Sequence, residues 1–372
     1  MNLCLAHGGD VTQPSGGTTR VVSIASGLDE RGFDVTLVVP EPEGEYPEPL
    51  ENVDIRPVST DLFGVSNALT RAEKITSTAK RVASERGAHL QLEHSTLAGI
   101  GTFRGCGNYI LDMHDLAYGR FDHVDTSFAP VLKRGVSWIE RRAVDRAAHI
   151  VVVSEYMREF LSTEWGIPAN EITVVPNGYA PETIGGYEET TEIDGRVAFL
   201  GTLHPKVDVD AFERVASLPA VSEVVVIGDG ALRDEVEALA ADHDSIEAKG
   251  RLPDDEAFEL LSSAAVAINP QSQSELQRSS SPVKLYYYAA LGLPMVVAPG
   301  PTVVDELVEM DAAVTASEST VVADRVGELL ANDERRKTIG ENARGASEAF
   351  SWARRIDMFE TTYRNTIGPQ YE

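Results

Sequence analysis

The chain has 372 residues, of which 42% are hydrophobic, and this length and apolar content suit two separate cores better than one. The formal net charge is −27, from 59 acidic and 32 basic residues, which argues against general nucleic-acid binding because that needs a basic face. Only seven of the 32 basic residues are lysines, and this acidic, lysine-poor composition predicts a halophilic organism, such as a halophilic archaeon, whose molar salt screens the repulsion.

The first residues of the chain predict a strand and no export signal. The opening MNLCLAHGG has no basic start and only a short apolar run, and no later run approaches the roughly 18–20 apolar residues of a membrane span. Cys4 and Cys106 lack the spacing of metal ligands, so we expect buried reduced thiols. These features together predict a cytoplasmic protein.

Short apolar segments rich in β-formers alternate with helical segments along the whole chain, as in parallel sheets covered by helices. In the first half the predicted strands are 2–6, 34–39, 53–58, 89–92, 109–112 and 150–153. In the second half they are 197–200, 223–227, 245–248, 266–269 and 294–298. Two helices are predicted with particular clarity, at 17–32 and 130–148. The pattern predicts an α/β protein with two doubly wound, Rossmann-like domains and a ligand in the cleft where strand carboxyl ends face each other.

One segment has the composition of a linker between the two halves. Residues 181–195 are rich in Gly, Thr and Glu and show no apolar period. We therefore predict an N-terminal domain over 1–181, a linker over 182–195, a C-terminal domain over 196–348 and a closing helix over 349–372.

The most informative segment is SSSPVKLYYYAALGLPMVVAP, which begins at Ser279. Pro282 suits a helix start, where free N–H groups and the positive end of the helix dipole favour an anion. Lys284 adds a positive charge, and Gly292 ends the helix before a buried strand. The segment predicts an anion cradle for a nucleotide diphosphate.

Two further features lie at predicted strand ends in the first half. Gly16 and Gly17 allow backbone N–H groups to approach a phosphate, although an ordinary tight turn is the alternative and no G-x-G-x-x-G dinucleotide fingerprint is present. His114 follows the strand at 109–112, where α/β sheets place ligands. A neutral imidazole there would hydrogen-bond a hydroxyl group of a ligand, with Asp115 orienting it, and the alternative is a histidine that caps a turn.

Nine blocks of sequence, in order, resemble the retaining glycosyltransferases of family 4, which have the two-domain GT-B fold and use nucleotide-sugar donors. The first half carries PSGGTTRVVSIASGLDERGFDVTLVV, LDMHDL, IERRAVDRAAHIVVVSEYMRE and VVPNGY. The second half carries VAFLGTL, VVVIGDGALRDEVEALA, AKGRLPDDEAFELLSSAAVAINP, SPVKLYYYAALGLPMVV and FSWARRIDMFETTYRN. The resemblance covers nearly the whole chain. It implies transfer of a sugar, with retention of configuration, to a glycan or lipid-linked acceptor.

The resemblance also implies roles for individual residues. His114 would lie beside the donor sugar, while Lys206 and Lys284 would stabilise the leaving diphosphate. The alternative for both lysines is an ordinary surface position. The implied donor-binding residues are Gly16, Gly17, Thr202, Arg251, Leu252, Glu275, Ser281, Pro282 and Tyr287. No metal and no cofactor is implied, because the nucleotide sugar is a co-substrate.

The sequence departs from the family pattern at two positions. Thr202 stands where the family usually has an Arg, and Tyr287 stands where a Glu holds the donor ribose. The earlier Glu of the family's paired-Glu motif corresponds to Ser279, and Glu275 lies close enough in sequence to substitute. These departures leave open a non-catalytic member that binds a nucleotide sugar. A sugar-nucleotide epimerase on the same fold also stays open, whereas the missing glycine fingerprint disfavours a nicotinamide dehydrogenase.

The helix predicted at 130–148 has the densest positive charge of this acidic chain. It carries Lys133, Arg134, Arg141, Arg142 and Arg146. Contact with anionic lipid head groups at the inner face of the membrane is one interpretation. A solvated helix face with internal ion pairs is the other.

Overall fold

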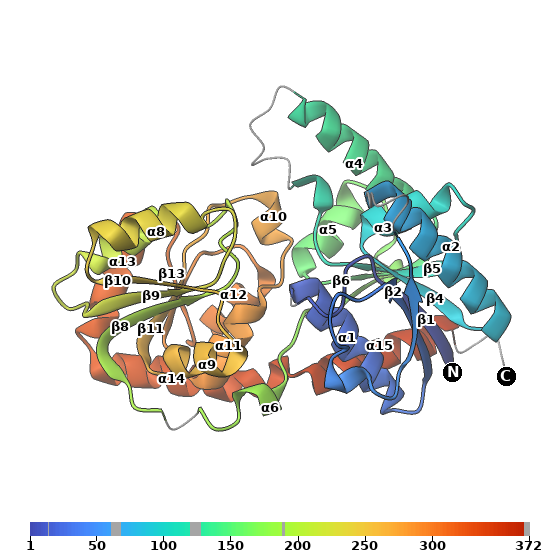
Figure 1. Cartoon of the computed structure of the whole chain (residues 1–372). Coiled ribbons are helices and arrows are strands. Elements are labelled where there is room, and N and C mark those ends of the chain that lie inside the picture. Colours follow the sequence, from blue (N-terminus) through green and yellow to red (C-terminus); the bar gives the residue numbers. More distant parts are fainter. Residues whose placement is uncertain (14, 61–67, 120–127, 188–189, 368–372) are drawn as a thin grey trace. The chain divides into compact units, whose positions relative to one another are not determined.

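The protein is described by a computed structural model that covers the chain except residues 14, 61–67, 120–127, 188–189 and 368–372. The described residues form two compact units (Figure 1). Unit 1 comprises Met1–Asn177, Ser279–Ser281 and Trp352–Glu372, and unit 2 comprises Gly178–Arg278 and Pro282–Ser351. Each unit is described by itself below.

Unit 1 is built on a seven-stranded parallel sheet with the order β3-β2-β1-β4-β5-β6-β7. The strands are β1 (Asn2–Ala6), β2 (Asp34–Pro40), β3 (Asp54–Val58), β4 (His89–Glu93), β5 (Tyr109–Met113), β6 (Ala147–Val152) and β7 (Ile172–Val174). The helices are α1 (Gly16–Asp29), α2 (Ala68–Arg86), α3 (Ser95–Thr102), α4 (Ala129–Val144), α5 (Glu155–Thr163) and α15 (Trp352–Ile367), with short 3₁₀ turns η1 (Glu48–Leu50) and η3 (Ala169–Glu171).

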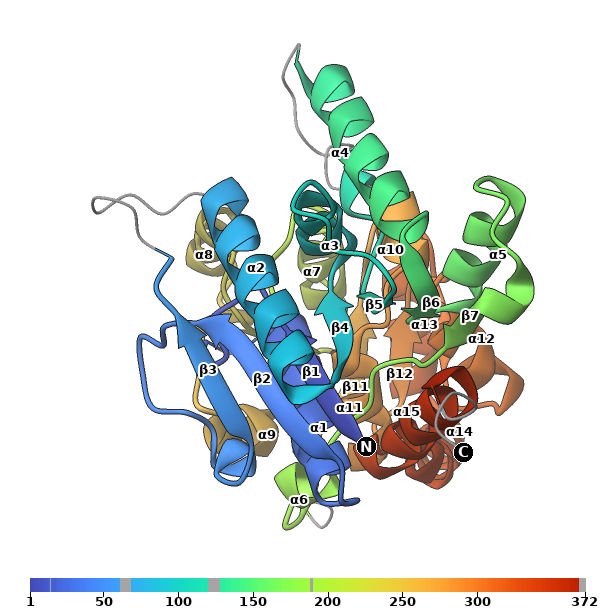
Figure 2. The ribbon, with the colours of Figure 1, turned by 90° about the vertical axis from the view of Figure 1, so that its right-hand side faces the viewer.

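Helices cover both faces of this sheet, because successive residues of a strand point to opposite sides. Leu3 and Leu5 of β1 belong to a core shared with α1 and α15, whereas Cys4 and Ala6 belong to a core shared with α2. Figure 2 shows α2 on one side of β1 and α1 on the other. Both cysteines are buried free thiols, as predicted.

Unit 2 has a six-stranded parallel sheet with the order β10-β9-β8-β11-β12-β13. Its strands are β8 (Ile193–Leu200), β9 (Glu223–Ile227), β10 (Ile246–Gly250), β11 (Ala264–Asn269), β12 (Met295–Val297) and β13 (Val314–Thr315). Its helices are α6 (Pro181–Ile184), α7 (Asp210–Ala216), α8 (Arg233–Asp242), α9 (Asp254–Ser262), α10 (Glu275–Arg278), α11 (Val283–Leu291), α12 (Thr302–Glu309), α13 (Ser319–Leu330), α14 (Asp333–Ser347) and the 3₁₀ turn η4 (Glu348–Phe350). Two buried cores again lie on opposite faces of the sheet, one including α11 and α12 and the other α7 and α13.

The two parallel-sheet units confirm the predicted fold class, and each predicted strand has its counterpart. The sequence did not predict the short edge strands β7 and β13, because three or two residues are too few to show a period. Two predicted helices are too long at their C-termini. The helix predicted at 17–32 is α1, which ends at Asp29, and Gly32 has φ 81° in the turn that follows. The helix predicted at 130–148 is α4, which ends at Val144 because Ala147 already belongs to β6.

The predicted linker at 182–195 is partly regular structure. It contains most of the helical turn α6, and β8 begins within it at Ile193. The division into units falls earlier, between Asn177 and Gly178, and the last helix, α15, belongs to unit 1. The cleft expected between the two domains stays a prediction.

Candidate functional site

Three histidines meet at the carboxyl edge of the sheet in unit 1. His7 follows β1, His94 follows β4 and His114 follows β5, and these three strands are neighbours in the sheet. The ring centroids of His7 and His94 are 5.6 Å apart, and those of His94 and His114 are 4.0 Å apart. Parallel strands place their carboxyl ends on one edge, so residues far apart in sequence form a single cluster.

The start of α1 faces this cluster through Gly17. A Cβ at this position would lie 3.3 Å from His94 Nε2, 3.5 Å from His114 Nδ1 and 3.6 Å from His7 Cε1. The helix start is fixed by a capping box in which Ser15 Oγ accepts from the Thr18 N–H and Thr18 Oγ1 accepts from the Ser15 N–H. The predicted glycine loop therefore lies at a helix N-terminus, with its second glycine against three imidazoles.

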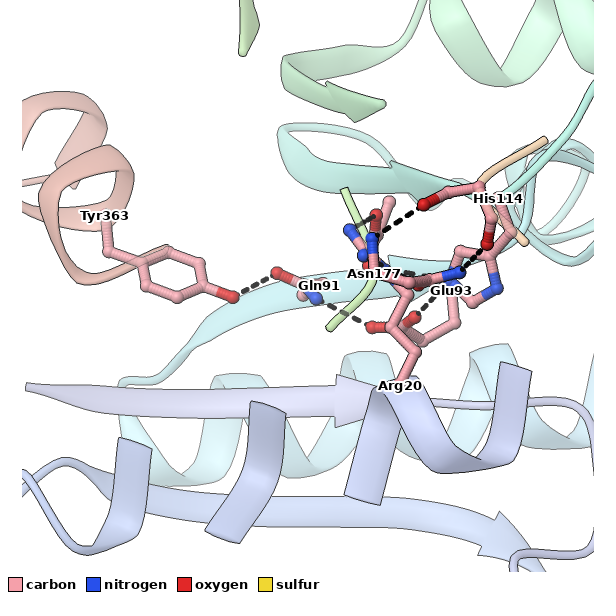
Figure 3. Close-up of polar contacts among 8 residues, drawn as sticks. Arg20, Gln91, Glu93, His114, Asn177 and Tyr363 are labelled. Carbon is pink, nitrogen blue, oxygen red and sulfur yellow. Dashed lines mark hydrogen bonds and ion pairs between the residues drawn. The ribbon is translucent and has the colours of Figure 1, made fainter. Parts of the chain in front are cut away.

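Two buried carboxylates hold the His114 ring. Its Nε2 lies 2.8 Å from Glu93 Oε2 and 3.5 Å from Asp112 Oδ2, and both carboxylate side chains are fully buried (Figure 3). The partner that the sequence suggested was Asp115. The structure corrects this, because Glu93 ends β4 and Asp112 lies in β5, so both side chains reach the ring from within the sheet.

Arg20 of α1 neutralises part of this buried negative charge. Its Nε and Nη2 donate to the two oxygens of Asp112 at 2.8 and 2.9 Å, and its Nη1 donates to Asn177 Oδ1 at 3.1 Å. Burial alone would raise the pKa of Asp112, but Arg20 and His114 hold it below its usual value. Burial and the neighbouring Asp112 raise the pKa of Glu93. The cluster is thus an ion network assembled from α1, β4 and β5.

The same network determines the charge of the histidines. Burial by itself would lower the pKa of His114, but Asp112 and Glu93 raise it to about 9, so the ring is an imidazolium at neutral pH. This differs from the neutral ring that the sequence suggested. Burial and the His114 charge lower the pKa of His7 to about 3. Within the described part of the chain, His114 Nδ1 is buried without a hydrogen-bond partner, and it lies 3.5 Å from the position of a Cβ at Gly17.

A chain of polar groups connects His114 to the last helix. The Tyr363 hydroxyl of α15 donates to Gln91 Oε1, and Gln91 Nε2 donates to Glu93 Oε1 at 2.7 Å (Figure 3). Glu93 then contacts His114 through its other oxygen. Sequence analysis missed Arg20, Gln91, Glu93, Asp112, Asn177 and Tyr363. The available signal was the polar residues within two otherwise apolar strands, HLQLE and YILDM.

Glu140 fixes the backbone that follows His114. This buried residue of α4 accepts from Ser95 Oγ at 2.6 Å and from the N–H groups of Ala117 and Tyr118 at 2.9 and 3.0 Å. Burial raises the pKa of Glu140 to about 7 despite these three donors. Since Ser95 follows His94, one carboxylate ties together the segments that carry two of the three histidines.

The loop Ser279–Ser281 also belongs to unit 1. The N–H of Asn177 donates to Ser281 Oγ at 3.0 Å, and its side-chain amide donates to the Ser281 carbonyl at 2.8 Å. Ser154 Oγ donates to the Ser279 carbonyl at 3.2 Å. Ser281, which the resemblance assigns to the donor, is therefore hydrogen-bonded through Asn177 to the Arg20 network.

In unit 2, Lys284 lies in the first turn of α11 and reaches the end of β8. Its Nζ is 4.0 Å from the centroid of the Phe199 ring, and a Cβ at Gly201 would lie 2.5 Å from the same nitrogen. Gly201 has φ 137°, a backbone region that favours glycine. Burial first and the charge of Lys206 second lower the pKa of Lys284 to about 7. The two predicted diphosphate ligands are thus close enough to repel each other.

The remaining predicted donor residues have mixed surroundings. Pro282 is the N-cap of α11, one position before the first turn where the sequence put it, and Gly292 ends the helix in the left-handed conformation as predicted. Tyr287 packs edge-on against Phe258, with ring centroids 4.9 Å apart, and burial raises its pKa to about 12. The rest differ in exposure: Thr202 and Arg251 are exposed, and Leu252 and Glu275 are partly buried.

One group of described residues has the donor types of a metal site. Glu93, Asp112 and His114 offer ligand atoms within 4.8 Å of one another. However, both oxygens of Asp112 already accept from Arg20, and His114 Nε2 already contacts Glu93. The set fits an ion network between side chains better than a metal centre.

The fold and the family matches define the class of protein. Residues 15–178 match the Glycosyl transferase 4-like domain, and residues 209–361 match a Glycosyl transferase-like domain. No curated protein matches the sequence. Each half of the chain therefore carries a glycosyltransferase domain, and the chain is a glycosyltransferase of the GT-B fold.

Solved structures support this fold over the whole chain. Sucrose-phosphate synthase from Thermosynechococcus elongatus has a TM-score of 0.80 at 14% identity, with 99% of each chain covered. WaaG, a glycosyltransferase involved in lipopolysaccharide biosynthesis, has a TM-score of 0.73 at 15% identity, again with 99% of each chain covered. HepE of Anabaena, solved in complex with UDP-glucose, has a TM-score of 0.71 at 15% identity and covers 98% of this chain and 99% of its own. At these identities the likeness shows the fold alone.

Proposed function

We propose that this protein is a retaining, metal-independent hexosyltransferase that moves a sugar from a nucleotide-sugar donor to a glycan or lipid-linked acceptor. The observation that carries the proposal is the buried Lys284 in the first turn of α11, with Lys206 of the segment after β8 close enough to lower its pKa. Two like charges near a desolvated helix N-terminus repel each other in the unliganded protein, and an anion that binds them relieves this cost. A nucleotide diphosphate is such an anion, and complexes of HepE with UDP and with UDP-glucose support a uridine nucleotide as the first candidate.

The proposed reaction breaks the bond between the sugar anomeric carbon and the diphosphate oxygen. The leaving diphosphate keeps the electron pair, and Lys284 and Lys206 stabilise its developing charge. The acceptor oxygen bonds to the anomeric carbon on the same face, and its proton goes to the departing phosphate oxygen, which gives retention. His114 donates through Nδ1 to a sugar hydroxyl and fixes the ring, so the protein needs no metal for these steps.

The proposed setting is the cytoplasm of a halophilic organism. The support is the net charge of −27 together with the scarcity of lysine. None of the helices that the structure describes is long and apolar enough to cross a bilayer. We propose that a lipid-linked acceptor is met at a membrane surface.

Calorimetry with UDP, GDP, ADP and CMP sugars tests the donor site in the purified protein in molar KCl. We expect saturable binding of one nucleotide sugar, which Lys284→Ala abolishes. Lys337→Ala is the matched control, because this lysine of α14 is 77% exposed. Equal binding by both variants, or no binding by the folded wild type, would overturn the donor site.

A non-catalytic nucleotide-sugar-binding protein is the second candidate. It is favoured by the Tyr287 ring, which packs on Phe258 at the position where the family has a ribose-binding carboxylate. NMR of the bound donor separates the candidates. An enzyme releases or transfers the sugar with its anomeric configuration kept, in the presence of EDTA, whereas a binding protein leaves the donor intact.

A further inference from the structure

Helix α4 exposes an apolar face. Four large hydrophobic side chains on and just before this helix are exposed: Phe128 (71%), Val131 (66%), Leu132 (48%) and Trp138 (57%). Val131 and Leu132 follow Phe128 by three and four residues, and Trp138 follows Leu132 by six. This spacing puts all four on one side of a helix. Phe103, which follows α3 and is 55% exposed, extends the same surface. We call these five residues the α4 face. Among the described residues they are half of the exposed large hydrophobic side chains.

The α4 face is continuous and accessible within unit 1. The rings of Phe103 and Trp138 are 5.7 Å apart, and the Arg142 guanidinium lies 4.6 Å from the centroid of Phe103. The contacts of α4 with the rest of unit 1 are made largely from its second half, where Glu140, Ala143 and Val144 are buried. Figure 2 shows the first turns of α4 extending beyond the other helices of unit 1.

Arginine side chains lie beside the α4 face in a chain whose net charge is −27. Arg134 and Arg146 are exposed, and Arg141 and Arg142 are partly exposed. Lys133 is not part of this border, because its Nζ lies 5.4 Å from the centroid of the buried Tyr118 ring. Of the two acidic residues within the described segment 128–146, Glu140 is fully buried and Asp145 is paired with Arg141 at 3.0 Å. An apolar face with a cationic border is complementary to a surface that offers both hydrocarbon and negative charge.

We propose that the α4 face docks on anionic lipid bilayers, with Trp138, Val131 and Leu132 in the interfacial region and the arginines on lipid phosphates. Tryptophan and phenylalanine beside arginine are the residues of helices that lie in a membrane interface. A second copy of this chain fits less well, because two such faces would bring their cations together. The proposal does not rest on the proposed transfer reaction.

Co-sedimentation of the full chain with vesicles tests this proposal. One set of vesicles contains phosphatidylglycerol and phosphatidylcholine, and the other contains phosphatidylcholine alone. The test variant is Val131→Ser/Trp138→Ser, and the matched control is Val308→Ser/Met310→Ser on and beside α12, where the native side chains are 42% and 41% exposed. Near-ultraviolet circular dichroism verifies that both variants are folded.

We expect the wild type and the control to bind anionic vesicles, and the α4 variant to bind at least about tenfold more weakly. Arg134→Glu should weaken binding at low salt and have little effect in molar KCl, where charges are screened. Equal binding by the α4 variant and the wild type would overturn the proposal, as would no binding by the wild type. A wild type that dimerises without binding vesicles, and an α4 variant that stays monomeric, would also overturn it and make this face an interface between copies.

Discussion

Gln91 is the link through which the last helix acts on His114, and its replacement tests the polar chain described above. Gln91→Met keeps the volume of the side chain and removes its polar atoms. The Tyr363 hydroxyl then loses its acceptor and Glu93 Oε1 loses a donor, and both groups are buried. Each unpaired buried group costs about 1–3 kcal/mol, so we expect the free energy of unfolding to fall by roughly 2–6 kcal/mol.

The same change should lower the pKa of His114. The hydrogen bond from Gln91 favours the charged form of Glu93, and Glu93 favours the charged form of His114. Without that bond Glu93 is less readily ionised, and we expect the pKa of His114 to fall from about 9 by roughly one unit, which corresponds to about 1.4 kcal/mol. NMR titration of the His114 ring measures this shift directly.

Two further variants separate electrostatics from packing. Tyr363→Phe in the Gln91→Met background removes the orphaned hydroxyl, so the double variant should recover about 1–3 kcal/mol relative to the sum of the single changes. Gln273→Met is the control, because this exposed glutamine donates to the Pro299 carbonyl and lies outside the polar chain from Tyr363 to His114. An unchanged His114 pKa in a folded Gln91→Met protein would refute the proposed chain.

Three other predictions concern single groups. His114 has a pKa of about 9 in the folded protein against an ordinary 6.5, so its stabilising contribution should be complete below pH 6.5 and disappear as pH rises through 9, which urea unfolding at several pH values measures. The pKa of Lys284 in the unliganded protein is about 7, so donor binding at a pH somewhat above 7 should be accompanied by proton uptake. Calorimetry in buffers of different ionisation enthalpy measures this uptake, and a binding enthalpy that is the same in all buffers would contradict the prediction. Gly201 has φ 137°, so Gly201→Ala should lower the free energy of unfolding by about 1–3 kcal/mol, and its Cβ should weaken donor binding by crowding Lys284. Gly345→Ala on α14 is the control, because a Cβ there meets open space, and it should have neither effect.

The sequence determined the architecture because the relevant signals are local. Short apolar strands alternating with helices can form only a few topologies, and the right-handed crossover rule reduces them further. Strand-end placement together with the family resemblance singled out His114, and a Pro-started helix with a lysine in its first turn singled out Lys284. Strands of two or three residues, such as β13, carried too little pattern to be found.

Only the tertiary structure decided what charges these residues carry and which residues hold them. Glu93 and Asp112 lie 19 positions apart in sequence, yet neighbouring strands bring both to one imidazole, and α1 adds the guanidinium of Arg20. Tyr363 arrives from the end of the chain through α15. A pKa depends on burial and on charges a few ångströms away, and neither can be read from sequence neighbours. The raised pKa of His114 and the lowered pKa of Lys284 are therefore properties of the fold, while the positions of both residues could be predicted from the chain itself.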